Sequence, residues 1–440
     1  MYNGEGLVPT SSNWMGLLGF VLILGTAFLM SNNKKAINYR LVVSGLILQL
    51  GLAIFVLKVP FGQELFKNVG AFITELLHFS DEGAGMVFGP LVTQQKKLVE
   101  VFGPGADFIF AFRVVPTIIF VSSLVSISYY LGIMQKVVQI VARVVSVVMG
   151  ASGAEALSNA ASVFVGQVEA QLLIKPYVPT MTRSELLASM AGSMACVAGG
   201  VLAVYIGIGI KASYLLTASI MAAPAALVIS KIVYPETEES TTRGKVSIAV
   251  ERTQANIIDA AAHGASDGMR IGMNVLAMLI AFIALIALCD AALGFLGTKL
   301  YAFGVRLDGL GLDLAHLSLK DIFGTIFAPI AFVLGVPWAD AHSVGQLMGE
   351  KFVINEFVAY TDLSAILKNP GTLSAQAETI VTFALCGFAN LSSIAMQIGG
   401  IGEIAPTRRE DLARLGVKAL ICGTMASYLS ACLAGILNQL

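Results

Sequence analysis

The chain has 440 residues, of which 56% are hydrophobic and 12% are charged, and its net charge is -1. A soluble domain carries roughly 25% charged residues, so this composition and a mean hydropathy of +0.81 exclude a soluble fold and indicate an integral membrane protein. The nearly balanced charge gives no support for nucleic-acid binding.

Eight segments are apolar and long enough to be candidate transmembrane helices, each of which needs about 20 mostly apolar residues. They are Trp14–Ser31, Leu41–Leu57, Val114–Met134, Leu186–Ile210, Ser213–Ser230, Ile271–Leu288, Thr379–Gly402 and Ala419–Leu437. Basic residues gather in alternate connections, for example at Lys34, Lys35 and Arg40. The positive-inside rule assigns those connections to the cytoplasm, which predicts that both termini lie outside.

Two further segments have the pattern of amphipathic helices. In Phe61–Leu77, apolar residues recur at helical spacing with charged and polar residues between them. Such a helix is expected to lie in the membrane interface or to pack on a partner subunit. The segment Val246–Asp259 shows a weaker form of the same pattern.

Two long stretches of the sequence, Gly150–Ala203 and Gly335–Met396, resemble each other. Each opens with a glycine followed five residues later by an acid, then reaches a polar cluster, and ends in an apolar segment interrupted by glycine and small polar residues. The clusters are Gln167 with Glu169 and Asn355 with Glu356, and the interruptions are Gly199-Gly200 and Gly387 to Ser393. Broken apolar helices at matching places in two halves indicate a transporter binding site near the bilayer midplane. Chance similarity is the alternative, because small apolar residues recur throughout membrane proteins.

The charged residues in these stretches argue against ordinary transmembrane spans. Ala151–Val178 and Ile322–Tyr360 each contain several ionisable residues, and a charge at the bilayer centre costs about 2.5–3.5 kcal/mol even on lenient scales. Both are therefore predicted to be re-entrant hairpins buried within the protein. Three predicted spans separate them, so the hairpins should open on opposite sides of the membrane as an inverted repeat.

The polar clusters have the chemistry of a site for a sugar or a nucleobase. An amide such as that of Gln167 offers a donor and an acceptor together, and the carboxylates of Glu169 and Glu356 need hydrogen bonds, a cation or a proton when buried. Asn390 and Ser393 lie three residues apart and would share a helix face, while Phe388 could stack on a planar ring. The alternative is structural: a network that ties each hairpin to a helix, with Phe388 in the core.

Enzyme motifs give little support for catalysis. The sequence contains no HExxH, P-loop or GxSxG motif. Glu169 and Glu356 could serve as an acid/base pair, but no nucleophile or metal cluster accompanies them. We therefore predict that the protein is not an enzyme.

Five motifs resemble those of the concentrative nucleoside transporter family. They are GQVEAQLLIKPYV (Gly166–Val178), NIIDAAAHGASDGM (Asn256–Met269), IFAPIAFVLGVPW (Ile326–Trp338), GEKFVINEFVAY (Gly349–Tyr360) and TFALCGFANLSSIAMQIGGIG (Thr382–Gly402). The resemblance runs from about Phe110 to the C-terminus.

The resemblance implies an all-α integral membrane protein with eight transmembrane helices, two opposed re-entrant hairpins in an inverted repeat, a homotrimer and elevator transport. It divides the chain into N-terminal scaffold spans with an interfacial helix (1–106), a scaffold span (107–134), the first hairpin repeat (135–234), an amphipathic segment with a scaffold span (235–300) and the second hairpin repeat (301–440). The two hairpin repeats would form the mobile transport domain. The implied location is the bacterial inner membrane.

The resemblance also implies roles for the site residues. Gln167 would contact the base, and Glu169 would stand near the base or the ribose. The ribose hydroxyls would be held by Glu356, Asn390 and Ser393, with Phe388 packed on the nucleoside. Val168 departs from the family, which often has Thr or Ser there, so a hydroxyl contact to the base is lost.

The same comparison bears on the coupling ion. Sodium-coupled members use an Asn and a Ser or Thr at the positions of Ser162 and Cys196, with carbonyls here at Val165 and Val197. A hard cation prefers oxygen ligands, and a thiol is a poor one. Proton coupling is therefore favoured, with Glu169 or Glu356 as the proton carrier, and sodium at these four residues is the alternative.

The leading hypothesis is a nucleoside–cation symporter without a prosthetic cofactor. The alternatives are a symporter for a free nucleobase or another ribose-like solute, a membrane enzyme acting on a nucleoside-like substrate, and a channel.

Overall fold

The computed structural model describes residues 12–103, 109–243, 254–303, 314, 317–369 and 371–439. Helices are the regular elements throughout this part of the chain, which confirms the prediction of an all-α protein with many apolar helices. The helices are α1 (Ser12–Leu29), α2 (Tyr39–Leu57), α3 (Pro60–Phe88), α4 (Pro90–Thr93), α5 (Gln95–Phe102), α6 (Phe110–Tyr130), α7 (Ile133–Met149), α8 (Gly153–Ser162), α9 (Glu169–Leu172), α10 (Arg183–Ala195), α11 (Gly199–Gly207), α12 (Ala212–Val233), α13 (Ile257–Ala302), α14 (Leu319–Val333), α15 (Trp338–Val353), α16 (Glu356–Leu367), α17 (Ala375–Leu385), α18 (Leu391–Ile404) and α19 (Arg409–Gln439).

Six of the described helical stretches are long and apolar enough to cross a membrane. They are α2, α6, α10 with α11, α12, α13, and α19 with the short turn before it. A further pair, α14 and α15, meets these criteria only when taken together and is bent by 119° at its break, while α1 is shorter. The predicted segment Thr379–Gly402 is divided between α17 and α18.

Three sequence-based helix boundaries are wrong. The segment predicted as Val114–Met134 ends at Tyr130, and α7 starts separately at Ile133, because Gly132 between them adopts a φ of +76° that interrupts the helix. The segment predicted as Ile271–Leu288 is the middle of the 46-residue α13, whose polar first turns continue the same helix. The amphipathic helix predicted at Phe61–Leu77 is present but continues to Phe88. Of the predicted Val246–Asp259 segment, residues 246–253 lie outside the described residues.

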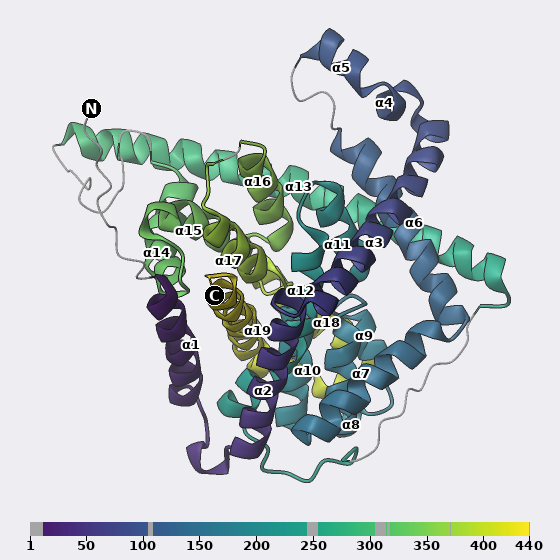
Figure 1. The fold of residues 1–440 in the computed structure, drawn as a ribbon, viewed down its shortest axis with the longest axis vertical. Helices are drawn as coiled ribbons and strands as arrows, with labels where there is room; N and C mark the ends of the chain where they lie inside the picture. The colour runs from purple at the N-terminus through teal and green to yellow at the C-terminus, as the bar shows by residue number, and fades with distance from the viewer. Residues whose placement is uncertain are drawn as a thin grey trace.

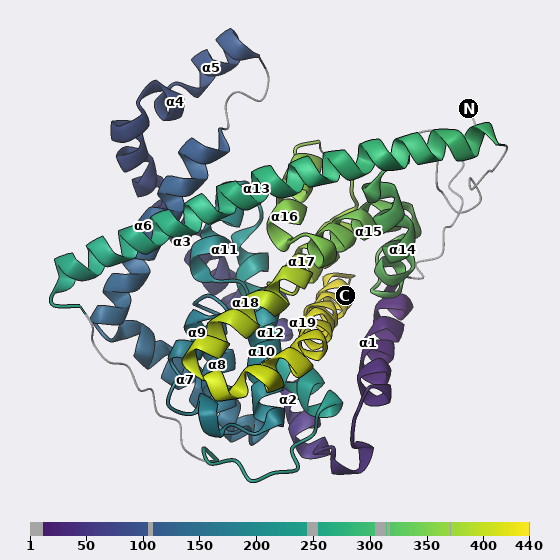
Figure 2. The same ribbon diagram turned by 180° about the vertical axis from the view of Figure 1, so that it is seen from behind.

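The elements follow the same order in the two halves of the chain. A helical hairpin (α8–α9) precedes a broken helix (α10–α11) and a long helix (α12), and then a second hairpin (α15–α16) precedes a second broken helix (α17–α18) and a second long helix (α19). We call α8–α9 the first hairpin and α15–α16 the second hairpin. Figures 1 and 2 show these two sets beside each other, with α10, α12, α17 and α19 in the middle of the molecule.

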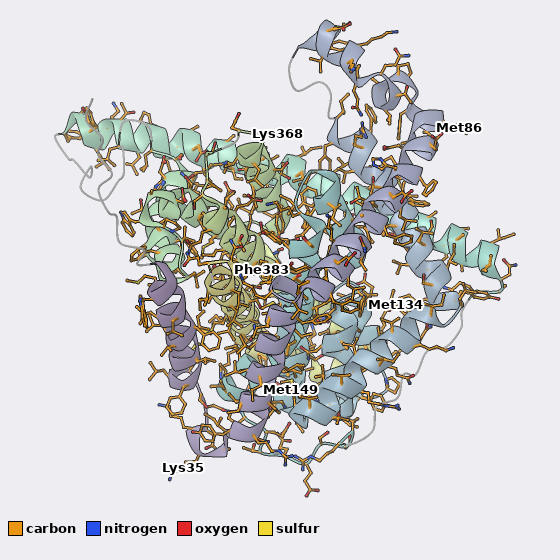
Figure 3. The ribbon with its side chains drawn as sticks, in the orientation of Figure 1. Lys35, Met86, Met134, Met149, Lys368 and Phe383 are labelled. Carbon is orange, nitrogen blue, oxygen red and sulfur yellow. The ribbon has the colours of Figure 1, made fainter. Side chains whose placement is uncertain are left out.

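The centre of the molecule is formed by α10, α12, α17 and α19, which pack on one another. Their facing residues are mostly small, such as Ala191, Ala226 and Ala431, all of them fully buried. Small residues let helix backbones approach closely where lipid offers no hydrophobic driving force between helices. Phe383 of α17 lies within this centre, whereas Lys35, Met86 and Lys368 lie at the periphery (Figure 3).

Two long helices, α6 and α13, pack against each other at one side of this centre. Their backbones are in close contact, since a Cβ atom added to Gly268 would lie 2.6 Å from the Cα of Ile119. In Figure 2, α13 runs across the whole width of the molecule, above α17 and α18 in this view. The helices α6 and α13 therefore form one wall facing both hairpin repeats.

An ion pair links the two repeats at the edge of the centre. Lys211, just before α12, lies 2.8 Å from a carboxylate oxygen of Glu378 in α17. Burial alone would lower the pKa of Lys211, but the hydrogen bond and the charge of Glu378 outweigh it and leave the pKa raised. The ion pair therefore favours the charged form of Lys211 at the contact between the two repeats.

Candidate functional site

A cavity of about 820 Å³ lies between the hairpin tips, the helix breaks and the wall formed by α6 and α13. Ligand pockets typically measure about 300–1,000 Å³, so this cavity can hold a drug-sized polar molecule. Six of the seven predicted substrate residues line it: Gln167, Val168, Glu169, Glu356, Phe388 and Asn390. The seventh, Ser393, is fully buried behind Asn390, and the neighbouring Ser392 lines the cavity instead.

Glu356 is the most firmly held polar group of the cavity. It is the first residue of α16, which Asn355 caps by accepting a hydrogen bond from the backbone N–H of Val358 (2.9 Å). Glu356 is 5% exposed, and its carboxylate accepts one hydrogen bond from the Tyr205 hydroxyl and one from the Asn390 amide, both at 3.1 Å. A buried carboxylate with two donors and a helix N-terminus behind it can stay charged. The carboxylate is thus fixed for hydrogen bonds with sugar hydroxyls.

The break between α17 and α18 brings Phe388 and Asn390 to the cavity. Gly387 adopts a φ of +114°, and a Cβ atom there would lie 2.6 Å from the carbonyl oxygen of Ala195, so only glycine fits. The next residue, Phe388, donates its backbone N–H to the carbonyl of Cys196 (3.3 Å). The two helix breaks are therefore in direct backbone contact.

Asn390 organises the start of α18. Its side-chain oxygen accepts from the backbone N–H of Ser393 (3.0 Å) and from the hydroxyl of Ser392 (2.7 Å), as an N-cap residue does. Ser393 also donates its hydroxyl to the Phe388 carbonyl. The Asn390 amide hydrogens thus remain for Glu356 and for a ligand, while Ser393 holds the break in shape.

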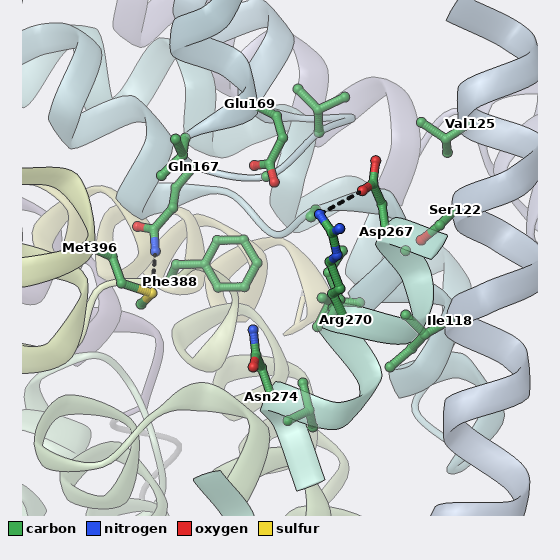
Figure 4. A pocket seen from close by; sticks show the side chains of 18 of the residues that line it. Ile118, Ser122, Val125, Gln167, Glu169, Asp267, Arg270, Asn274, Phe388 and Met396 are labelled. Atoms are coloured by element: carbon green, nitrogen blue, oxygen red, sulfur yellow. Dashed lines mark hydrogen bonds and ion pairs between the residues drawn. The ribbon is translucent and has the colours of Figure 1, made fainter. Parts of the chain in front are cut away.

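Gln167, at the tip of the first hairpin, faces α18. Its amide nitrogen lies 3.4 Å from the sulfur of Met396, and its amide oxygen accepts from Gln397 at 3.5 Å. Both contacts are weak, because a thioether is a poor acceptor and the second distance is long. The amide of Gln167 is therefore available to exchange these contacts for the edge of a base. Figure 4 shows Gln167, Met396 and Phe388 on the same side of the cavity.

Val168 packs against α18 as well as lining the cavity. A Cβ atom added to Gly400 would lie 2.6 Å from both methyl groups of Val168.

Glu169 differs from Glu356 because its carboxylate is exposed to the cavity. Among the described residues it has no hydrogen-bond or ion-pair partner within the usual distances. Figure 4 shows it opposite Asp267 and Arg270 of α13, whose charged atoms lie 4.0 Å apart. His263 pairs with the same Asp267 at 2.9 Å. The wall of the cavity opposite Glu169 thus carries both a carboxylate, from Asp267, and a guanidinium, from Arg270.

Sequence reasoning missed three groups of this site. The charged side chains on α13 could have been found, because ionisable residues beside a transmembrane segment often mark a transport pathway. Tyr205 and Met396 sit in apolar runs whose pattern gives no sign of the site they reach.

The four candidate cation residues belong to the tip of the first hairpin (Ser162 and Val165) and to the break between α10 and α11 (Cys196 and Val197). Ser162 donates its hydroxyl to the Ser158 carbonyl (2.8 Å) and lies 3.1 Å from the hydroxyl of Ser193, three residues before Cys196. Cys196 directs its thiol to the carbonyl of Ser219 (3.6 Å). Val165 and Val197 are buried. Among the described residues, no three His, Cys, Asp or Glu side chains are placed to hold a metal ion together.

Gln171 occupies the same corner. Its buried amide nitrogen donates to the hydroxyls of Ser193 (2.7 Å) and Ser158 (3.1 Å), and its oxygen accepts from Ser189 (2.6 Å). Amide hydrogens therefore satisfy hydroxyl oxygens that a sodium ion would need as ligands. These residues could bind sodium only if the hydrogen bonds between Gln171 and the serine hydroxyls rearranged.

The arrangement can bind a solute that has a planar part and a hydroxyl-bearing part. Gln167 and Phe388 offer an amide and an aromatic ring (Figure 4), and Glu356 with Asn390 offers acceptors and donors that line the same cavity.

Comparisons with known proteins agree with this geometry. The chain matches families described as Na⁺ dependent nucleoside transporter N-terminus over residues 18–91, nucleoside recognition gate over 111–212, and Na⁺ dependent nucleoside transporter C-terminus over 214–435. It is 40% identical to the nucleoside permease NupC of Helicobacter pylori, with 97% of this chain and 98% of that protein covered. It is also 40% identical to the sodium/nucleoside cotransporter 2 of Rattus norvegicus, covering 97% of this chain and 62% of that protein.

Solved structures match over nearly the full length. The structure of CNTnw in an inward-facing substrate-bound state is 41% identical, with a TM-score of 0.88 and coverage of 97% and 98%. A CNTnw variant in an outward-facing state is 41% identical, with a TM-score of 0.90 and coverage of 98% and 99%.

Proposed function

The chain belongs to the Na⁺-dependent nucleoside transporter family, and we propose that it is a secondary active symporter that imports nucleosides across the cytoplasmic membrane. The observation that carries this proposal is the position of Glu356. Its carboxylate, the Asn390 amide and the Gln167 amide come from three separate segments and line one cavity. Glu356 and Asn390 would hold the ribose, Gln167 would contact the base, and Phe388 would pack on the nucleoside.

We further propose that the chain has eight transmembrane helices and an elevator mechanism. The repeated order of hairpin, broken helix and long helix supports an inverted repeat with two opposed re-entrant hairpins. In this proposal, residues 135–234 and 301–440 form the moving transport domain. The scaffold consists of residues 1–106, 107–134 and 235–300, and its helices α6 and α13 form the wall past which the site slides. The proposed homotrimer rests on the resemblance to the concentrative nucleoside transporter family, and the amphipathic α3 is the element expected to lie in the membrane interface or on a partner subunit.

The proposed orientation has both termini outside a bacterial inner membrane. The basic residues at Lys34, Lys35, Arg408 and Arg409 support it.

For the coupling ion, the local chemistry favours a proton. Cys196 offers a thiol, Ser162 is already hydrogen-bonded, and Gln171 supplies amide hydrogens to the surrounding hydroxyls. Glu169, exposed to the cavity without a partner among the described residues, is the candidate proton carrier, with Glu356 as the second. Sodium is the other candidate, and the description of the family and the name of the rat relative support it.

Uptake into proteoliposomes tests the proposal. Saturable uptake of labelled uridine, competed by adenosine and less by uracil or ribose alone, is expected for a nucleoside symporter. Equal competition by uracil or by ribose would favour a transporter of free bases or sugars. Imposing sodium and proton gradients separately identifies the ion, and uptake that needs sodium and ignores pH would overturn proton coupling.

Turnover of a nucleoside by detergent-solubilised protein, without compartments, would favour a membrane enzyme. Uptake that does not saturate would favour a channel.

A further inference from the structure

Lys351, in the last turn of α15, is a buried charge that the substrate site does not use. Its side chain is 1% exposed, and its ammonium donates to the carbonyl oxygens of Ala384 (2.8 Å) and Cys386 (3.2 Å). Among the described residues, no carboxylate oxygen lies within ion-pair distance of it. The other fully buried lysine, Lys231, differs, because Glu155 (2.7 Å) and Glu236 (3.3 Å) neutralise it.

The carbonyls that receive Lys351 belong to the break of the second broken helix. α17 ends at Leu385 because the chain turns at Cys386 and Gly387. The last carbonyls of a helix have no partner within it and carry partial negative charge. In transporters, such carbonyl ends of broken helices are places where a cation is coordinated. Here the cation is an ammonium group that belongs to the chain itself.

Lys351 and Glu356 form hydrogen bonds on the two sides of this break. Lys351 holds the end of α17 through Ala384 and Cys386, while Glu356 holds the start of α18 through Asn390. Both residues belong to the second hairpin, one on each side of its tip at Ile354 and Asn355. The ammonium therefore fixes the distance between the hairpin tip and the break, and with it the place of the ribose-binding carboxylate.

The first half of the chain has no such charge at the corresponding break. Its hairpin tip, from Ser162 to Glu169, contains no Lys or Arg. The corner between this tip and Cys196 is filled by the hydroxyls of Ser162 and Ser193 and by Gln171. Only neutral groups of the described residues occupy it.

We propose that Lys351 is a tethered cation, whose ammonium fills at the second helix break the kind of place that a free cation would occupy at the first. The inference rests on the proposed function. It makes Lys351 a positioning residue for ribose recognition.

Nucleoside binding to purified protein in detergent, by calorimetry, tests this assignment. Lys351→Met keeps the length of the side chain and removes the charge, and is expected to weaken uridine binding about 10- to 100-fold. The variant should also lose much of the preference for uridine over 2′,3′-dideoxyuridine, because Glu356 is displaced from the ribose. Unchanged affinity and unchanged preference would overturn the assignment.

Chemical rescue separates charge from packing. Lys351→Ala should leave space in front of the Ala384 and Cys386 carbonyls, and propylammonium is expected to restore uridine affinity at least about 10-fold, while 1-propanol is not. Equal restoration by 1-propanol, or a loss that propylammonium does not restore, would assign Lys351 a packing role and overturn the cation role.

Lys231→Met is the matched control. It also removes a buried ammonium, but one that pairs with carboxylates away from the cavity. It should lower the unfolding temperature and leave the ribose preference unchanged. Absence of uridine binding by the unsubstituted protein would count against the proposed function, whereas normal binding by that protein and by Lys351→Met would count only against the tethered cation.

Discussion

The hydroxyl of Tyr205 lies 3.1 Å from a carboxylate oxygen of Glu356 and joins the first broken helix to the second hairpin. Tyr205 is fully buried in α11, and its ring stacks on Tyr360 with a centroid distance of 4.4 Å. The residue that would bind ribose is therefore positioned by both halves of the chain.

Tyr205→Phe should weaken nucleoside binding. The substitution keeps the ring and leaves one oxygen of a buried carboxylate without its donor, so we expect KM for uridine to rise about 10-fold or more. Tyr360→Phe is the control, because the Tyr360 hydroxyl donates to the Thr382 carbonyl (2.7 Å) and not to Glu356. The measurement is KM for uridine uptake by both variants. An equal rise in KM for both would show that the hydrogen bond to Glu356 does not determine nucleoside binding.

Glu356→Gln should remove nucleoside uptake and leave folding intact. The amide has nearly the same shape, but it loses the charge and one acceptor that the ribose hydroxyls would use. We expect kcat/KM for uridine to fall by roughly 100-fold or more. Size-exclusion elution and the unfolding temperature report on folding, and Glu378→Gln, which loses only the pair with Lys211, should retain uptake. Normal uptake by Glu356→Gln would remove this residue from the site.

Val168→Thr should change the base preference more than the recognition of ribose. Threonine has the shape of valine and adds a hydroxyl beside Gln167, which can bond to polar atoms of the base. The ratio of kcat/KM for uridine and adenosine is the measurement, and inhibition by 2′-deoxyuridine reports on ribose contacts. Val168→Ala removes a side-chain contact with Gly400 without adding a hydroxyl and serves as the control. A selectivity that Val168→Thr leaves unchanged would exclude a role for this position.

A double substitution, Ser162→Asn with Cys196→Ser, should create or strengthen dependence on sodium. It replaces a thiol and a hydrogen-bonded hydroxyl by oxygen groups that suit a hard cation. Uridine uptake at constant pH, measured over a range of sodium concentrations, should become steeper than for the unsubstituted protein. Cys196→Ala, which adds no oxygen, should not produce the change. A double variant with the original sodium response would argue against a cation place at this corner.

Much of the site could be predicted from the sequence because its residues interrupt apolar runs. Gln167, Glu169, Glu356 and Asn390 stand where glycine or charge makes an unbroken span improbable, and the structure places all four around one cavity. The hairpin tips and helix breaks can be predicted because they depend on local composition, which the sequence shows directly.

The other residues of the site could not be predicted, because their roles depend on tertiary contacts that the sequence pattern does not reveal. Tyr205 and Met396 are apolar in pattern and acquire a role only because α11 and α18 meet the hairpin tips. The predicted segment Ile271–Leu288 is shorter than α13 (Ile257–Ala302), because hydropathy marks only the apolar part of a helix, and polar residues such as His263, Asp267 and Arg270 continue the same helix. The family resemblance implies that Ser393 contacts the ribose, and the sequence does not show that its hydroxyl also donates to the Phe388 carbonyl.

The hydrogen bond from the Phe388 amide to the Cys196 carbonyl has a consequence for energy coupling. Cys196 is one of the four candidate cation residues, and Phe388 carries the ring that would cover the nucleoside. Binding of the coupling ion and binding of the nucleoside would then be linked through this one backbone hydrogen bond. The order in which ion and nucleoside bind, and the fixed ratio in which they are transported, would depend on this hydrogen bond. Variants that weaken it should be the first to let ions cross without nucleoside.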